Sequence, residues 1–137
     1  MSNIASPEWT KQLSSALQSS SDVRAAAATW THGPIALNVN ADEERSFAGA
    51  TVVLEVRDGS VSAAVGPQLT PFSFSGSLDR WQAVFSGTST MVDAALESKL
   101  HVRGDLPSLQ RHRGLLDAIA SVAGGLTTTW PEAPAKA

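Results

Sequence analysis

The 137-residue sequence contains no cysteine and no tyrosine, and its aromatic content is limited to four tryptophans and four phenylalanines. The absence of cysteine excludes disulfides, iron–sulfur clusters, cysteine-rich zinc sites and thiol catalysis. It also suits a reducing compartment, and we expect a cytoplasmic protein. A chain of this length buries enough surface to fold without a disulfide or a metal, so we expect no metal and no cofactor.

Positive charge is also scarce, since ten Lys and Arg stand against thirteen Asp and Glu, for a net charge of -3. Such a surface lacks the dense positive field that a phosphate backbone selects, so we expect no nucleic-acid partner. The opening residues "MSNIASPEWTKQL" lack the basic and then apolar order of a signal peptide. Long uncharged runs are broken by Ser, Gly, Thr or Pro and do not have transmembrane character.

The first thirty residues have the pattern of amphipathic helix. Ser6 and Pro7 form a favourable helix start, and Trp9, Leu13 and Leu17 then follow one helical stripe. A run of serines interrupts this stripe at residues 19–21. The sequence therefore predicts two helices, or one helix with a break at the serines.

From residue 34 onward the apolar period changes to two. Alternation over residues 35–39, 52–56, 61–65 and 70–75 predicts strands with one apolar side each. The dipeptide at 58–59, Asp-Gly, is a strong hairpin signal because both central turn residues need positive φ. Strands of this kind form an antiparallel sheet with a single buried face, and further segments must cover that face.

Three later segments are predicted to be helical. Ser77 and Thr90 are placed as N-caps of two short helices, and Asp105 as the cap of a final helix that ends at Gly124-Gly125. The apolar stripe of that final helix comprises Leu109, His112, Leu116, Ile119 and Ala123.

A predicted strand over residues 99–103 precedes the final helix. Leu100 and Val102 belong to its apolar side, and Lys99, His101 and Arg103 alternate with them. We interpret this polar row as a solvated strand face rather than a binding site, because three scattered basic residues produce a weak field.

The segments "FSFSGSLDRWQAVFSG" and "AALESKLHVRGDL", followed by an apolar helix, resemble the sterol carrier protein 2 family. The resemblance rests on Trp81 with Gly87, on the Ala94-Ala95 pair, and on the motif of residues 99–105, and it covers about residues 30–125. It implies an α+β fold in which a mainly antiparallel sheet of about five strands is covered on one face by helices. We expect one domain over 1–126, with N-terminal helices in 1–30, the sheet and covering helices in 34–126, and a flexible tail over 127–137.

The resemblance also implies a hydrophobic tunnel between sheet and helices that carries a fatty acid, acyl-CoA, sterol or polyketide-like molecule. The covering helices are rich in alanine, which either leaves a void or lets the helices approach the sheet closely, and the sequence leaves both open. We expect the final helix and residues 81–87 to gate access. The expected partner is an apolar small molecule, with transient contact with a membrane as a further possibility. The sequence does not indicate the oligomeric state. The residues expected to contact the ligand are Phe72, Phe74, Trp81, Phe85, Met91, Leu100, Val102, Leu116 and Ile119.

Several of these residues have a second interpretation as ordinary core. Large aromatic and aliphatic side chains are more often core than ligand contacts. For Trp81, the alternative is that its indole N–H binds a backbone carbonyl and anchors its helix. Met91 is the best single choice for an adaptable wall, because its thioether side chain is flexible.

Two other functions stay open. The first is a small cavity enzyme of isomerase, cyclase or hydrolase type, as on the NTF2-like fold, which would use a buried His or Asp. The NTF2-like fold typically ends in long strands, whereas this chain is predicted to end in a helix, which favours the carrier. A ligand-free interaction module would have a closed, filled core. We expect no catalysis, and His112 is the weak catalytic candidate, with a core histidine as its alternative. The titratable residues considered are His32, His101, His112, Asp42, Glu43, Glu44, Asp105 and Asp117.

Overall fold

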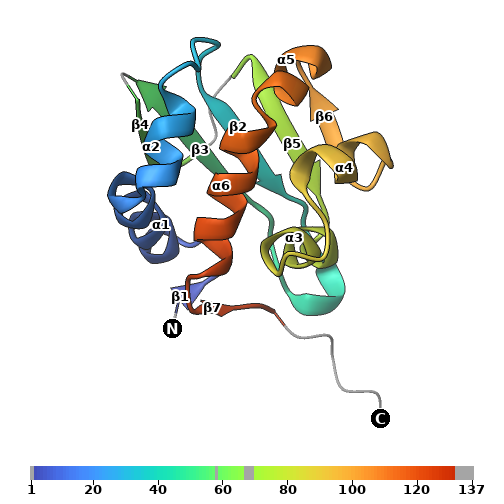
Figure 1. Cartoon of the computed structure of the whole chain (residues 1–137). Coiled ribbons are helices and arrows are strands. Elements are labelled where there is room, and N and C mark those ends of the chain that lie inside the picture. Colours follow the sequence, from blue (N-terminus) through green and yellow to red (C-terminus); the bar gives the residue numbers. More distant parts are fainter. Residues whose placement is uncertain (1, 58, 67–69, 132–137) are drawn as a thin grey trace.

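The computed structural model describes residues 2–57, 59–66 and 70–131, and it has the expected α+β fold (Figure 1). Its helices are α1 (Pro7–Ser19), α2 (Ser21–Ala27), α3 (Leu78–Phe85), α4 (Met91–Leu96), α5 (Leu106–Arg111) and α6 (Arg113–Gly124), with a short 3-10 turn at Glu43–Arg45. Its strands are β1 (Ser2–Asn3), β2 (Ile35–Val39), β3 (Ala50–Arg57), β4 (Ser60–Val65), β5 (Phe72–Gly76), β6 (His101–Arg103) and β7 (Thr128–Thr129). No helix in these described ranges combines the length and the apolar character that crossing a membrane requires.

The main sheet has five strands in the order β4-β3-β2-β5-β6. Neighbouring strands are antiparallel except for β2 and β5, which run parallel. The mainly antiparallel sheet of about five strands is therefore confirmed. Because the hairpin β3–β4 occupies one edge of β2, the returning chain pairs with the other edge, and this crossover produces the parallel pair.

The predicted hairpin joins β3 to β4 in the expected antiparallel register, with Arg57 opposite Ser60. Gly59 has a φ of 74°, which suits a turn residue without a side chain. Its predicted turn partner, Asp58, lies outside the described residues.

The helices cover one face of the sheet, and α6 runs down the middle of this layer, between α1–α2 on one side and α3–α4 on the other (Figure 1). The apolar sides of the central strands face them. Ile35 lies opposite Phe72 and Leu37 opposite Phe74, and each of these four side chains is at most 5% exposed. Leu116 and Ile119 of α6 are fully buried in the same core.

The predicted helix starts at Ser6, Ser77 and Thr90 are confirmed by hydrogen bonds to their side-chain oxygens. Ser6 Oγ accepts from the backbone N–H of Trp9 at 3.2 Å, Ser77 Oγ from that of Arg80 at 3.3 Å, and Thr90 Oγ1 from that of Asp93 at 3.1 Å. Of the two N-terminal alternatives, the structure has two helices. Ser20 ends α1 and caps α2 by accepting from the backbone N–H of Val23.

The prediction of one final helix capped by Asp105 is wrong. The segment forms two helices, α5 and α6, which break at His112. The Asp105 side chain makes no backbone cap and instead accepts a hydrogen bond from Ser108 Oγ at 2.6 Å. Packing of the His112 ring against Trp30, with ring centroids 5.0 Å apart, accompanies the break. The apolar stripe of the predicted final helix continues across His112, so the sequence pattern gave no sign of a break there.

Ordered structure continues past the boundary at residue 126 that the composition predicts. Thr128–Thr129 form β7, which pairs in parallel with β1 near the N-terminus. The indole N–H of Trp9 donates to Thr128 Oγ1 at 2.8 Å, which ties α1 to this pair. Residues 132–137 of the expected tail lie outside the described residues.

Candidate functional site

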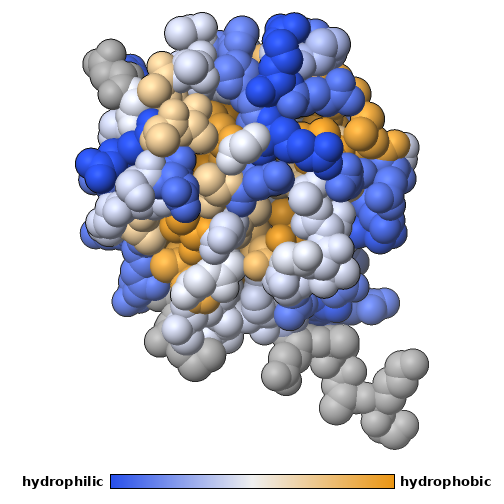
Figure 2. All heavy atoms as spheres, in the orientation of Figure 1, coloured by the Kyte–Doolittle hydropathy of each residue, from blue (hydrophilic) through white to orange (hydrophobic). Residues whose placement is uncertain are grey.

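A pocket of about 500 Å³ lies between the C-terminal end of α3, the loop that leads to α4, and one side of α6. Apolar residues reach the surface alongside α6 on this face of the molecule, between paler and hydrophilic residues (Figure 2). The lining residues are Val84, Phe85, Ser86, Gly87, Ser89, Thr90, Asp117, Ala120, Ser121, Gly124 and Gly125.

Helix α6 supplies one wall of this pocket, and its two sides differ in character. Asp117, Ser121 and Gly124 recur at spacings of four and three, so they share one side of the helix. Leu116 and Ile119 lie on the side that packs into the core. The same helix therefore closes the core with one side and borders the pocket with the other.

The opposite wall comes very close to α6 at Gly124. A β-carbon added at Gly124 would clash with the backbone carbonyl of Phe85, so only glycine fits where these two helices meet. This contact lets the C-terminal ends of α3 and α6 approach closely and closes one end of the pocket. A smaller pocket of about 170 Å³ lies on the other side of Phe85 and Gly124, next to Thr128 and Trp130.

Phe85, one of the residues that line the pocket, belongs to a cluster of aromatic rings. The ring centroid of Phe85 lies 5.6 Å from that of Trp81, and 6.1 Å from those of Trp9 and Trp130. The indole N–H of Trp81 donates to the backbone carbonyl of Asn38 at 2.9 Å, which confirms the anchoring role given above as its alternative. Phe85, which is only partly buried, is the member of this cluster that also lines the pocket.

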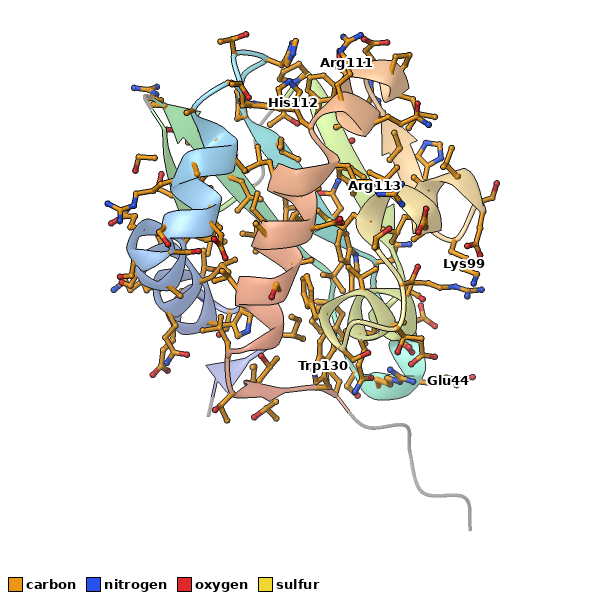
Figure 3. The ribbon with its side chains drawn as sticks, in the orientation of Figure 1. Glu44, Lys99, Arg111, His112, Arg113 and Trp130 are labelled. Atoms are coloured by element: carbon orange, nitrogen blue, oxygen red, sulfur yellow. The ribbon has the colours of Figure 1, made fainter. Side chains whose placement is uncertain are left out.

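An ion pair lies beside Thr90, one of the residues that line the pocket. The Arg113 guanidinium donates to Asp93 and, at 3.3 Å, to Thr90 Oγ1, so it links α6 to α4. Figure 3 shows the Arg113 side chain pointing from α6 toward α4. The hydrogen bond from Arg113 lowers the pKa of Asp93 below its ordinary value.

Asp117 has no such partner. Its Oδ1 is buried and makes no hydrogen bond to the described part of the chain. Burial raises the pKa of Asp117, an effect that Asp93 increases and Arg113 opposes. A buried carboxylate oxygen without a donor is costly, and such groups are uncommon in folded proteins.

Most of the residues predicted to contact a ligand are buried in the sheet–helix interior. Seven are at most 5% exposed: Phe72, Phe74, Trp81, Met91, Leu100, Leu116 and Ile119. Phe85 and Val102 are partly buried. Phe85 lines the main pocket, and Leu100 and Val102 line a separate pocket of about 350 Å³ beside Ala95 and His101. Ligand contact by these nine residues stays a prediction.

His112, the catalytic candidate, lies in a different cluster. Its ring centroid is 5.0 Å from that of Trp30 and 5.4 Å from that of His32, and it is not among the residues that line the main pocket. Burial lowers the pKa of His112, and the nearby His32 and Arg111 lower it further. His112 is thus partly buried against aromatic rings, and its catalytic role and its alternative as a core histidine both stay predictions.

The polar row beside Leu100 is exposed. Lys99, His101 and Arg103 all face solvent, and Lys99 Nζ lies 3.0 Å from a carboxylate oxygen of Glu97. Among the described residues, no group of three or more His, Asp or Glu side chains is placed to hold a metal ion.

From the sequence, Asp117 was only one of several titratable residues, Gly124 only marked the end of the final helix, and Ser121 was not singled out. A signal was present, because small and polar residues recur along α6 beside its apolar stripe. Such a stripe usually faces water, so the pattern alone does not distinguish a solvated side from the wall of a pocket.

Comparison with known proteins supports the architecture described above. The sequence model of the SCP-2 sterol transfer family matches residues 11–117. A crystal structure of sterol carrier protein 2 is similar with a TM-score of 0.81 and 25% identity, over 91% of this chain and 100% of that chain. A conserved hypothetical protein from Thermus thermophilus, whose description suggests a sterol carrier protein, has a TM-score of 0.80 and 25% identity, over 94% of this chain and 93% of that chain.

A more distant structure shares the fold alone. Sterol carrier protein 2 from Yarrowia lipolytica, in its apo form, has a TM-score of 0.58 and 11% identity, over 87% of this chain and 89% of that chain. A search of curated protein sequences finds no match.

Proposed function

This chain belongs to the SCP-2 sterol transfer family, and from that premise we propose that it binds and carries an apolar small molecule of the fatty acid, acyl-CoA, sterol or polyketide-like type. The name of the family and the two structures at 25% identity support lipid binding in general terms. The proposed site is a tunnel that starts at the pocket between α3 and α6 and extends toward the sheet.

The observation that carries the proposal is the pocket beside the Phe85 ring cluster. Its volume of about 500 Å³ is within the range of roughly 300–1,000 Å³ typical of small-molecule sites. One wall carries Val84, Phe85 and Ala120, which offer apolar surface to a hydrocarbon chain. Removing such a chain from water contributes about 25 cal/mol per Å² of apolar surface.

Extension of the ligand toward the sheet requires side chains to move, because Trp81, Met91 and Ile119 are fully buried. Phe85 is the proposed gate, since it is only partly buried and lies between the pocket and Trp81. Met91 has a flexible thioether side chain that adapts to an irregular guest. Gly87, which follows α3 with a φ of 86°, gives the end of this helix freedom to shift.

Native mass spectrometry of the purified chain tests the proposal directly. We expect an added mass of a small apolar molecule that organic extraction removes, and rebinding when lipid extract is returned. A chain that copurifies with nothing, and that takes up neither a fatty acid nor a sterol, would instead be an interaction module without a ligand.

A pair of tryptophan substitutions locates the site. Ser121→Trp places a large ring at the exposed lining of the pocket and is expected to reduce uptake at least about tenfold, because it fills the space that the ligand needs. Gln18→Trp on the exposed side of α1 is the matched control and should bind normally. Equal uptake by both variants would place the ligand elsewhere.

The proposal includes a cytoplasmic location and transient contact with membranes during loading. The absence of cysteine supports the first, and the apolar residues exposed alongside α6 support the second (Figure 2). Transfer of a fluorescent lipid between vesicles should then depend on vesicle concentration, whereas simple diffusion through water would not.

A further inference from the structure

In the part of the chain that the structure describes, Asp117 Oδ1 is the one buried side-chain oxygen or nitrogen that makes no hydrogen bond, and its residue lines the pocket. Oδ1 is buried and has no hydrogen-bond donor in the described part of the chain. The nearby carboxylate of Asp93 is different, because it is paired with Arg113. A buried acceptor in this state lacks the donor that it needs. Asp117 as a whole is only partly buried and lines the pocket, so rotation of its side chain brings this oxygen to a donor in the pocket.

Three of the hydroxyl groups that line the pocket are engaged elsewhere, whereas Ser121, one helical turn after Asp117, is exposed. Ser86 Oγ donates to the carbonyl of Ala83 at 3.0 Å or bonds to Thr88, and Ser89 Oγ donates to the carbonyl of Thr90. Thr90 Oγ1 accepts from Arg113 and caps α4. The protein therefore surrounds Asp117 with polar groups and directs these three hydroxyls to other atoms.

The charges around Asp117 restrict what its partner is. A carboxylate end group would bring a second negative charge to a buried acceptor that has no proton to offer when it is ionised. An ammonium end group would be attracted to Asp117, but it would bring a full charge into a pocket whose other lining includes Val84, Phe85 and Ala120. A neutral hydroxyl donates one hydrogen bond to the Asp117 carboxylate and adds no charge to the pocket.

The apolar part of the same pocket fits the rest of such a molecule. Val84, Phe85 and Ala120 line the pocket together with Asp117, so a hydrocarbon body packs against them while its polar end meets the carboxylate. We propose that Asp117 accepts a hydrogen bond from the hydroxyl group of the bound apolar molecule, and that the site therefore selects lipid alcohols over lipid carboxylates. This inference rests on the proposed function and specifies the polar end of its ligand.

Dodecanol and dodecanoate test the selection, because they share one hydrocarbon chain and differ only at the end group. Displacement of Nile red from the full-length chain at neutral pH measures both affinities. We expect dodecanol to bind at least about tenfold more tightly, since a site built to pair with a hydroxyl rejects an end group that leaves it unpaired.

The isosteric variant Asp117→Asn identifies the residue responsible. Its amide donates to a carboxylate as well as accepting from a hydroxyl, so we expect the preference to fall to within about threefold. Asp22→Asn, the same change at an exposed position on α2, should retain the preference of the original chain. A ¹³C NMR titration adds a direct readout, because a hydrogen bond from dodecanol should lower the pKa of the Asp117 carboxyl.

The outcomes separate this inference from the proposed function. Equal affinity for the two probes, or a preference that Asp117→Asn leaves unchanged, overturns the inference and indicates that the carboxylate meets only water. Failure of the original chain to bind either probe, or any fatty acid or sterol, overturns the proposed function instead.

Discussion

The two sides of α6 show how one helix serves two opposed requirements. On the inner side, Leu116 and Ile119 are fully buried against the sheet, and on the other side Asp117 and Ser121 border a pocket of about 500 Å³. The inner side gains free energy from every apolar group it removes from water. The pocket side gives up packing and leaves a carboxylate oxygen unpaired, which costs stability.

This difference indicates where the chain is optimised for folding and where it is available for binding. Sites that bind ligands commonly retain groups that are unfavourable in the empty protein, because these groups find their partners only when the ligand arrives. Substitutions on the two sides of α6 should therefore have opposite consequences for stability and uptake.

Truncation on the inner side should have the largest effect on stability. Ile119→Ala is expected to lower the free energy of unfolding by about 2–5 kcal/mol, because it leaves a cavity in a fully buried site. Ser121→Ala on the pocket side should change it by less than about 0.5 kcal/mol. Urea denaturation of both variants measures the contrast, and similar losses would show that the two sides are not distinct.

Substitution of two glycines of α6 by alanine distinguishes the effect of helix propensity from that of close packing. Gly124→Ala should destabilise the chain by about 1–3 kcal/mol, since its β-carbon would meet the carbonyl of Phe85 and push α3 away from α6. Gly114→Ala has open space around the new methyl group and should stabilise by about 0.5–1 kcal/mol. Thermal unfolding of the pair tests this, and stabilisation by Gly124→Ala would contradict the close approach of the two helices.

Asp117→Asn should raise stability at neutral pH by at most about 1 kcal/mol, because it removes the charge from a partly buried side chain whose buried oxygen lacks a donor. The raised pKa gives the sign of the pH dependence. The folded chain takes up the Asp117 proton at a higher pH than the unfolded chain, so the penalty is present above the folded pKa and is relieved as the pH falls through it. The advantage of the variant should shrink between pH 7 and pH 4 in thermal unfolding, and an advantage that grows on acidification would be inconsistent with this burial.

The start of α6 offers a third environment, in which His112 packs against Trp30 and His32. Its pKa is lowered from 6.5 in the folded chain by burial, His32 and Arg111. Above pH 6.5 both states carry neutral His112. As the pH falls below 6.5 the unfolded state binds the proton first, so stability falls toward the folded pKa.

His112→Gln should reduce the loss of unfolding free energy on acidification by less than about 1 kcal/mol. Unfolding at several pH values between 7.5 and 5 measures this loss. His101→Gln, at an exposed position on β6, is the control and should leave the loss of stability at acid pH unchanged. If only His101→Gln removed the fall of stability at acid pH, then His101 and not His112 would be its cause.

The smallest effect is expected at the polar row of Lys99, His101 and Arg103, which leads into and along β6. Lys99→Ala removes an exposed pair with Glu97 and should change neither lipid uptake nor, by more than about 0.5 kcal/mol, stability. Phe74→Ala, in the fully buried interior, should change uptake far more if the ligand reaches the sheet. A lipid titration of both variants compares them, and a larger effect of Lys99→Ala would make the basic row part of the site.

Much of the fold was predictable because its signals are local. Caps at Ser6, Ser77 and Thr90 depend on hydrogen bonds that span three residues, so the sequence contains both partners. The alternation in β2 and β5 depends only on which side of a strand is buried. The break at His112 was not predictable in this way, because its partner Trp30 is distant in the sequence.

The sequence by itself determined the fold class, the helix starts at Ser6, Ser77 and Thr90, and the apolar sides of the central strands, since these signals act through short and regular spacings. Only the tertiary structure decided that β2 and β5 run parallel, that Gly124 meets Phe85, and that Asp117 lies in a pocket without a donor. Each of these depends on the distance between segments far apart in the chain. The spacing of residues within one element does not encode that distance.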